Sequence, residues 1–318
     1  MIVPRFVSYH FSNTTSERQS RKAIQKGNPL DQSTAWYLNE LNRRFYETRA
    51  QAFSATRNNS WRGWERALDA AGLLGRQDGQ GRAKTCRTAI GEMSSSDELG
   101  RSREMGSGGL DAQGFSVLDV ACGNLRFEAW MGEMLPTSDL RFVAVDSCLG
   151  LLPEEFADNI RFVERDIISA LLLDGTTPLL PDEKAFDLVV SFGFMHHVPG
   201  MEARVALLNG LLTATRPGGH VIVSFWRFAD DEGLASRAEK STSAALSEGG
   251  MSILELDDGD YLLGFGGDAT SLRYCHSFTD RDIDAVLSSV EIPFDLVARF
   301  RADGRTNVLN EYVVLMRR

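Results

Sequence analysis

The stretch SVLDVACGNLRFE, residues 116–128, decides the fold of this chain. Its opening residues, 116–120, are largely apolar and predict a buried strand. A bend of small residues follows, and in it Gly123 can adopt backbone angles that residues with a Cβ resist. Asp119 stands near the end of the strand, so its carboxylate should face the bend. Because a strand–turn–helix unit presents free backbone amides at a helix N-terminus, the stretch predicts a site for a polar ligand.

The composition indicates a soluble globular protein. Of the 318 residues, 43% are hydrophobic and 25% are charged, and this length allows one large domain with appendages. No apolar run approaches the roughly 18 residues that a membrane helix needs, and the N-terminus lacks a secretory h-region. Cys86, Cys122, Cys148 and Cys275 show no CxxC pair and no metal spacing. We therefore expect reduced thiols, no metal, no membrane and a cytoplasmic location.

Charge is unevenly distributed along the chain. Residues 1–75 carry 11 Lys+Arg and 6 Asp+Glu, whereas residues 115–318 carry 17 and 32, so the net charges are +5 and −15. Simple solubility is one explanation of this distribution. An acidic body also repels phosphates, which disfavours nucleic acid as a partner. The N-terminal arginines that could still form a basic stripe are Arg43, Arg44, Arg49, Arg57, Arg62 and Arg66.

The chain divides into four segments. Residues 1–33 are polar and lack sustained periodicity, which predicts a disordered tail. Residues 34–75 carry apolar residues at helical spacing and predict two N-terminal helices that cap the ligand site. Residues 76–114 hold eight glycines and five serines but no aromatic residue, so we expect a flexible insertion there. Residues 115–318 are left to form the main domain.

Strands and helical stretches alternate in the main domain. This alternation is typical of an α/β fold, in which a mainly parallel sheet carries helices on both faces. The last two expected strands are joined by a polar segment and form a terminal hairpin. The expected strands are residues 116–120, 142–146, 161–165, 186–192, 220–226, 294–300 and 311–316.

Acidic residues stand at the carboxyl ends of the first three strands, where open α/β sheets bind ligands. Asp119 ends the first strand. Asp146 ends the second, where a carboxylate can accept hydrogen bonds from both hydroxyls of a ribose. Asp166 follows the third and could accept from the exocyclic amine of a purine. Because a dinucleotide needs a fuller phosphate-binding loop, the pattern indicates a nucleoside with an amino-acid tail, S-adenosylmethionine (SAM).

Successive stretches of the main domain resemble the motifs of class I SAM-dependent methyltransferases. These are VLDVACGNLRFE, FVAVDS, VERDI, FDLVVSFGFMHHV and LLTATRPGGHVIVSFW. The resemblance covers residues 115–318 and implies a Rossmann-like, seven-stranded sheet whose last strand is antiparallel. Ala121 and Leu125 depart from the pattern, because they replace two glycines of its loop. The expected cofactor-binding residues are Arg57, Trp61, Asp119, Ala121, Gly123, Asn124, Asp146, Ser147, Asp166, Ile167, Ser191 and Phe192.

Three further stretches give a narrower resemblance. FYETRAQAFSATRNNSW, HHVPGMEARVALLNGLLTATRPGGHVIVSFW and RYCHSFTDRDIDAVL are similar to methyltransferases that esterify 5-carboxymethyluridine at the tRNA wobble position, including the methyltransferase domain of an AlkB-type hydroxylase homologue. The likeness implies tRNA as substrate and a small zinc-containing activator subunit as partner. Ser60 replaces a proline of the pattern, and the insertion at 76–114 is foreign to it. The matching residues are Phe53, Ser54, Thr56, Arg57, Trp61, His196, His197, Trp226, Arg273, Tyr274, His276 and Phe278.

The expected catalytic residues are Arg273, His196 and His276. The guanidinium of Arg273 can hold a carboxylate or phosphate through two parallel bonds, although a surface ion pair is an alternative role. A carboxylate nucleophile needs no general base, whereas an amine or hydroxyl does, and His196 could supply it. Arg57 could reach the carboxylate of the cofactor.

Three functions stay open at this point. The first is a tRNA-modifying methyltransferase of the carboxymethyluridine type. The second is a methyltransferase that acts on a small-molecule acceptor. The third is an inactive methyltransferase-like scaffold, which the retention of Asp119, Gly123, Asp146 and Asp166 disfavours.

Overall fold

The computed structural model describes residues 30–74, 114–135, 139–175, 179–180, 185–248, 254–266 and 268–318. The predicted tail (1–33) and flexible insertion (76–114) fall outside these residues, apart from a few positions at their ends. No helix in the described part of the chain is long and apolar enough to cross a membrane.

The core is a seven-stranded sheet with the order β3-β2-β1-β4-β5-β9-β8. Strands β1 to β5 are parallel, and β9 runs antiparallel between β5 and β8. This confirms the expected Rossmann-like α/β fold. The strand order reverses between β1 and β4, which is where open α/β sheets bind ligands. The strands are β1 (Phe115–Val120), β2 (Leu140–Asp146), β3 (Ile160–Glu164), β4 (Phe186–Ser191), β5 (Thr215–Trp226), β8 (Phe294–Ala302) and β9 (Asn310–Arg317).

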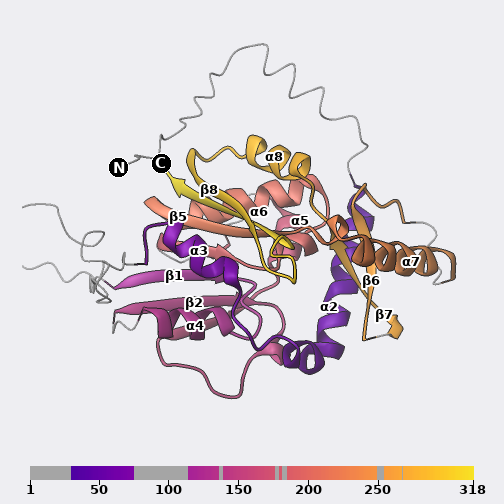
Figure 1. Ribbon diagram of the computed structural model, residues 1–318, viewed down its shortest axis with the longest axis horizontal. Coiled ribbons are helices and arrows are strands. Elements are labelled where there is room, and N and C mark those ends of the chain that lie inside the picture. Colours follow the sequence, from indigo (N-terminus) through magenta and orange to yellow (C-terminus); the bar gives the residue numbers. More distant parts are fainter. Residues whose placement is uncertain are drawn as a thin grey trace, which may run out of the picture.

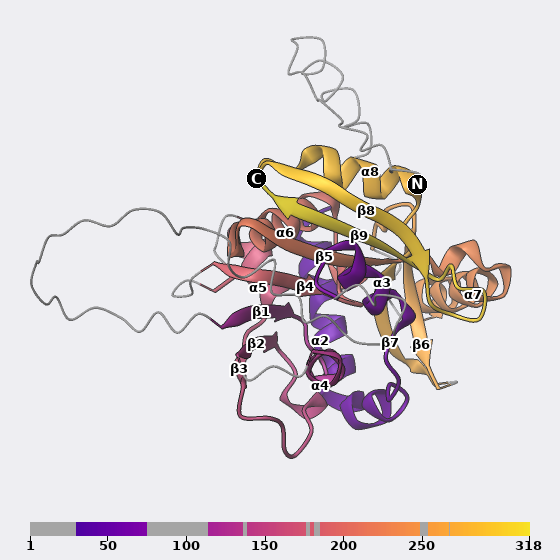
Figure 2. The ribbon, with the colours of Figure 1, turned by 60° about the vertical axis from the view of Figure 1, so that its left-hand side comes forward.

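Alternate residues of the central strands face two different hydrophobic cores. Leu118 and Val189 pack in a cluster under α5, α6 and α8, whereas Val117 and Val190 pack in a cluster under α3 and α4. Side chains alternate with period two along a strand, so both faces are covered by helices (Figures 1 and 2). The helices are α2 (Gln32–Ala55), α3 (Arg62–Ala70), α4 (Arg126–Met134), α5 (Ile167–Leu173), α6 (Met201–Ala214), α7 (Glu232–Glu248) and α8 (Asp280–Ser289), with short 3-10 turns η1 (Leu149–Leu151), η2 (Met195–His197) and η3 (Phe228–Asp230).

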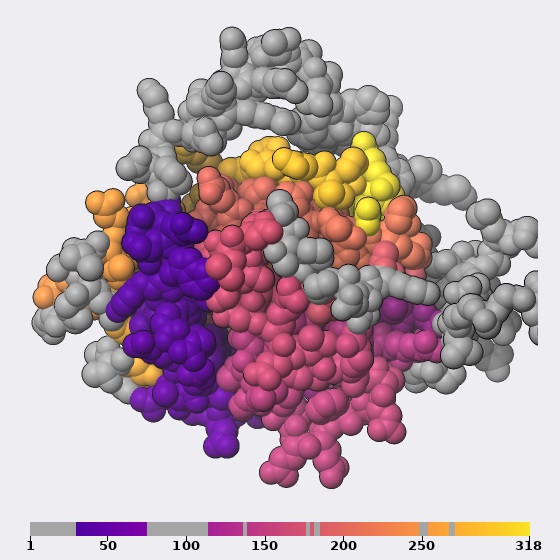
Figure 3. All heavy atoms as spheres, turned by 180° about the vertical axis from the view of Figure 1, so that it is seen from behind, coloured from indigo at the N-terminus to yellow at the C-terminus, as the bar shows by residue number. Residues whose placement is uncertain are grey.

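An accessory layer stands at one end of the main sheet (Figure 1). It consists of α2, α7 and a second antiparallel sheet made of β6 (Asp260–Phe265) and β7 (Asp268–His276). Helix α2 is fastened to β7, because Leu38 packs against Tyr274 and the Tyr274 amide donates to Asn42 Oδ1 at 2.7 Å. Figure 3 shows α2 in indigo from behind, beside the segment that carries β3 and α5. Neither this sheet nor α7 was predicted from the sequence.

Two boundaries differ from those expected. Helix α2 begins inside the predicted tail, because Asp31 caps it by accepting a hydrogen bond from the Thr34 amide at 3.1 Å. Strand β5 begins at Thr215 instead of residue 220. Its pairing with β4 shifts across residues 216–219, so the RPGG sequence forms an irregularity within the strand.

The bend between β1 and α4 contains three residues in the left-handed region. Their φ angles are 66° at Ala121, 59° at Gly123 and 59° at Leu125. Residues with a Cβ lose roughly 1–2 kcal/mol in this conformation, which explains why a glycine pattern suits these positions. Leu125 is buried against Cys122, which offsets part of its strain, whereas Ala121 is only half-buried.

Replacing Ala121 with glycine should therefore raise the free energy of unfolding, by up to about 1 kcal/mol after the entropy of glycine in the unfolded chain is subtracted. The matched control is Ala129→Gly, an exposed position within α4, which should lower it by about 1 kcal/mol. Urea denaturation of the ligand-free protein measures both. Equal losses in the two variants would show that Ala121 carries no strain.

Candidate functional site

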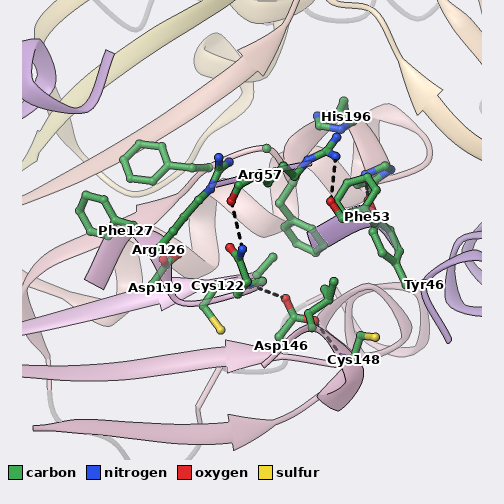
Figure 4. Close-up of a pocket in the computed structure, with 18 of the residues that line it drawn as sticks. Tyr46, Phe53, Arg57, Asp119, Cys122, Arg126, Phe127, Asp146, Cys148 and His196 are labelled. Atoms are coloured by element: carbon green, nitrogen blue, oxygen red, sulfur yellow. Dashed lines mark hydrogen bonds between the residues drawn. The ribbon is translucent and has the colours of Figure 1, made fainter. Parts of the chain in front are cut away.

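A cavity of about 520 Å³ opens at the carboxyl ends of β1, β2, β4 and β5 (Figure 4). The loop between α2 and α3 and the strand β7 complete its wall. Of the expected cofactor-binding residues, only Ser191 does not line it. Its buried hydroxyl donates to the Val120 carbonyl at 3.0 Å and so ties β4 to β1. The others line the cavity: Arg57, Trp61, Asp119, Ala121, Gly123, Asn124, Asp146, Ser147, Asp166, Ile167 and Phe192.

Asp146 connects the end of β2 to the bend. Its carboxylate accepts hydrogen bonds from the backbone amides of Gly123 and Cys148, both at 2.9 Å (Figure 4). Burial raises the pKa of Asp146, although these two bonds oppose the rise. A carboxylate has about four acceptor positions, so two are left for the hydroxyls of a ribose.

Asp166 also has a structural role that was not predicted from the sequence. It is the N-cap of α5, where it accepts from the Ser169 amide at 2.9 Å and from the Ser169 hydroxyl at 2.6 Å. Asn39 of α2 also donates to it at 3.4 Å. Asp166 still lines the cavity, so capping and cofactor recognition are compatible here.

Two arginines meet in the other half of the cavity. Arg273 is only 8% exposed, its Nε has no hydrogen-bond partner, and its guanidinium lies 5.2 Å from the ring centre of Phe53 and 5.9 Å from that of Trp226. Arg57 stacks on Phe53 at 3.3 Å and donates to the Thr56 hydroxyl at 2.8 Å. Burial, and next the charge of Arg273, lower the pKa of Arg57 to about 10. Neither arginine pairs with a carboxylate in the part of the chain that the structure describes.

The two histidines of η2 lie beside these arginines. His196 lines the cavity, and its pKa is far below the usual range because of burial, the adjacent His197 ring and the charges of Arg273 and Arg57. His197 accepts from Tyr46 Oη at 2.8 Å and donates from Nδ1 to the Tyr274 carbonyl at 2.9 Å, a tautomer that satisfies both contacts. Burial and the charge of Arg273 lower its pKa to about 3. Both imidazoles are therefore neutral at physiological pH.

Cys275 completes a buried trio with His196 and His197, whose possible ligand atoms lie within 4.8 Å of one another. The surroundings do not suit a metal ion. Both ring nitrogens of His197 are already hydrogen-bonded, and burial raises the pKa of the Cys275 thiol to about 12. The charge of Arg273 close by adds repulsion for a cation.

The structure does not bring His276, an expected catalytic residue, into the cavity. His276 does not line the cavity, and its Nδ1 contacts Asp260 at 2.7 Å. Asp260 also accepts from Tyr274 Oη at 2.8 Å, and buried Arg204 donates to the same hydroxyl at 2.8 Å. Because side chains alternate along β7, Arg273 faces the cavity while Tyr274 and His276 face this network. The network fixes β7 and thereby positions Arg273.

Several cavity residues were missed by the sequence analysis. Tyr46 and Asn42 were not singled out as site residues, because aromatic and polar residues at helical spacing in α2 are ordinary for a packed helix. Arg126 also lines the cavity and stacks over Trp61 at 4.8 Å. The only feature of the sequence that pointed to Arg126 was its position in the first turn of the helix after the bend.

Part of the sequence matches a family of methyltransferases. Residues 118–223, from β1 to β5, match the family model described as "Methyltransferase domain". The protein is a SAM-dependent methyltransferase. SAM is its cofactor, and the strand order, the bend and the acids at the strand ends suit that molecule.

Several solved methyltransferases are similar in structure. They include a SAM-dependent methyltransferase from Methanosarcina mazei (12% identity, TM-score 0.47, 64% of this chain and 93% of that chain). They also include N-methyltransferase NodS from Bradyrhizobium japonicum (11%, 0.37, 64% and 78%) and 1,6-didemethyltoxoflavin-N1-methyltransferase from Burkholderia thailandensis (19%, 0.40, 64% and 71%). No curated protein matches the chain. These overlaps are partial, and the order of the methyltransferase's own strands establishes its fold.

Asp146→Asn should weaken binding of the methyltransferase's cofactor product, S-adenosylhomocysteine, because the ribose loses a charged acceptor worth roughly 1.5–3 kcal/mol. Asp187→Asn is the matched control. Asp187 lies at the opposite end of the sheet, where it accepts from Ser116 and Arg216, so this variant should bind the ligand normally. Calorimetric titration measures both affinities, and unchanged binding by Asp146→Asn would exclude the ribose role.

Proposed function

We propose that this methyltransferase transfers the methyl group of SAM to a carboxylate of its acceptor and so forms a methyl ester. The observation that carries the proposal is the buried guanidinium of Arg273, which has no acidic partner among the described residues. A buried charge without a partner is costly, and an anionic ligand removes that cost. The cofactor's own carboxylate can neutralise one of the two arginines. We assign that role to Arg57, whose carbonyl accepts from Asn124 of the bend at 3.1 Å, so Arg273 is left for the acceptor.

The state of the histidines also favours a carboxylate. An amine or hydroxyl acceptor must lose a proton, and a useful general base has a pKa near the working pH. His196 stays neutral but binds a proton poorly, since its pKa is far below the usual range. His197 already uses both ring nitrogens. A carboxylate is ionised at neutral pH and needs neither residue as a base.

In this mechanism SAM supplies an electrophilic methyl group on a sulfonium. Asp146 would hold the ribose, Asp166 and Ile167 would flank the base, and Arg273 would orient the acceptor carboxylate. The reaction converts a sulfonium cation and a carboxylate anion into an uncharged thioether and an uncharged ester. An ion pair to the acceptor carboxylate therefore stabilises the ground state more than the transition state. The contribution of the protein is alignment inside a cavity walled by aromatic rings, which can supply ~7–11 kcal/mol.

The finer assignment, a carboxymethylated wobble uridine in tRNA, is a second candidate. It is supported by the motif residues that line one cavity although they come from distant parts of the chain. These are Phe53, Ser54, Thr56, Arg57, Trp61, His196, His197, Trp226 and Arg273.

The arrangement of the N-terminal arginines weakens the tRNA assignment. Arg43 and Arg44 pair with Glu40, and Arg43 also pairs with Glu47. Arg66 donates to a main-chain carbonyl and stacks on Phe300. These contacts leave little of the expected basic stripe for phosphates, so we favour a small-molecule carboxylate as acceptor. A tRNA substrate would need a partner subunit to supply positive charge.

The proposal is tested with SAM that carries a tritiated methyl group, incubated with the enzyme and with RNA or small-molecule fractions of cell extract. Mild alkali hydrolyses methyl esters and releases volatile methanol, whereas N-methyl and ether products resist it. We expect volatile label from the small-molecule fraction. Volatile label that depends on intact RNA would favour the tRNA candidate, and alkali-stable label alone would contradict esterification.

Arg273→Ala should lower kcat/KM for that acceptor by roughly 100-fold or more, because about 2–3 kcal/mol of charged hydrogen bonding is lost, while cofactor affinity stays unchanged. Arg273→Lys should recover only part of the activity, since a point charge cannot reproduce the guanidinium fork. Arg62→Ala, an exposed arginine in the first turn of α3, is the control and should match the wild type. Full activity of Arg273→Ala would refute the anion site.

A further inference from the structure

The loop between α2 and α3, residues 56–61, stands between the ligand site and solvent. Asn59 and Ser60 line the cavity and are exposed on their other side. The loop ends at Trp61, whose indole ring lies so close to Gly193 that a Cβ on this glycine would be 3.1 Å from the ring. Gly193 follows β4, next to the point where the strand order reverses. Because open α/β sheets bind ligands at that point, the place of the Trp61 ring bounds the space for methyl transfer.

Helix α3 begins directly after Trp61 and receives no cap from it. Trp61 is the N-cap residue, but within the described ranges its side chain makes no hydrogen bond to the first turn of the helix. The first amides of a helix have no partner inside the helix, so a buried one must find a partner elsewhere. The Trp64 amide donates back to the Trp61 carbonyl at 3.1 Å. The buried Gly63 amide needs an acceptor from another part of the chain.

The turn between β8 and β9 supplies that acceptor, 240 residues further along the chain. Asp303 Oδ1 accepts from the Gly63 amide at 3.1 Å. Its Oδ2 accepts from the Tyr312 hydroxyl at 2.6 Å and from the Asn310 side chain at 2.9 Å. A carboxylate at this position also interacts favourably with the helix dipole. Asp303 therefore caps α3 from outside the helix, and Figure 2 shows α3 beside β9.

The chain is shaped for this contact on both sides. Gly63 lies against the ring of Tyr312, where a Cβ would come within 2.1 Å of ring atoms, so only glycine lets α3 approach this closely. Asp303 has a φ of 65°, in the left-handed region that Asp and Asn adopt more often than other residues with a Cβ. The close approach and the unusual backbone angle both serve to hold the start of α3 against the turn.

We propose that Asp303 is a positioning residue for methyl transfer. By capping α3 it holds the Trp61 ring at the end of β4 and keeps the loop in place beside the bound cofactor. It acts through α3, because both of its oxygens are already hydrogen-bonded within the protein. The other end of the loop is tied separately, since Asn124 of the bend donates to the Arg57 carbonyl at 3.1 Å. Loss of Asp303 should therefore free one end of the loop and speed the release of the cofactor product, whatever the acceptor is.

The test is the rate at which S-adenosylhomocysteine dissociates from the immobilised protein, measured by surface plasmon resonance. Asp303→Gly removes the carboxylate and suits the positive φ. It should raise the dissociation rate about tenfold and change the association rate by less than about twofold, because a looser wall acts mainly on release. Asp303→Asn keeps one oxygen that can accept from the Gly63 amide, so it should raise the dissociation rate only about two- to fourfold.

The matched control is Thr279→Ala, which removes the N-cap of α8, a helix that contributes none of the described cavity residues. Both Thr279→Ala and Asp303→Gly should lower the melting temperature, but only Asp303→Gly should release the ligand faster. An unchanged dissociation rate in Asp303→Gly, or in Asp303→Asn if the glycine variant does not fold, would overturn the proposal. Equally fast release from Thr279→Ala would also overturn it, because any loss of stability would then have the same effect.

Discussion

The hydrogen bond from the Gly123 amide to the Asp146 carboxylate holds the site together. It joins the bend after β1 to the end of β2, at 2.9 Å, next to the point where the strand order reverses. The bend can reach Asp146 because Ala121, Gly123 and Leu125 all adopt left-handed angles. The cavity and the first turn of α4 both depend on that path of the chain. Local backbone strain is thus present where the cofactor binds, as is common at functional sites.

The second constraint is the accessory layer that carries the acceptor half of the cavity. Arg273 comes from β7, Arg57 from the loop after α2, and both come from outside residues 118–223, which match the methyltransferase family. The buried network of Arg204, Asp260 and Tyr274 fixes β7 against η2. The matched domain therefore supplies the cofactor half of the cavity, and segments outside it supply Arg57 and Arg273, the charges that we propose for binding an anionic acceptor.

The main sheet could be predicted because its strands are continuous apolar runs that end in Asp or a small residue. The cofactor-binding residues of the cavity could be predicted because they stand at the carboxyl ends of those strands. The accessory sheet could not be predicted, because the alternation of apolar and polar residues in RYCHSF is too short to distinguish a strand from a loop. For the same reason His276 was assigned to catalysis: adjacent letters hide the fact that residues of a strand face alternate sides.

The most direct test of the account is a crystal structure of the protein with S-adenosylhomocysteine and a carboxylate acceptor analogue. The account predicts that the ribose hydroxyls contact Asp146 and that the analogue's carboxylate is bound by Arg273. One carboxylate oxygen should then lie where a methyl group on the cofactor's sulfur would point, with the reacting atoms about 3–3.5 Å apart. A complex in which Arg273 stays stacked on its aromatic neighbours and the analogue binds elsewhere would contradict the central claim.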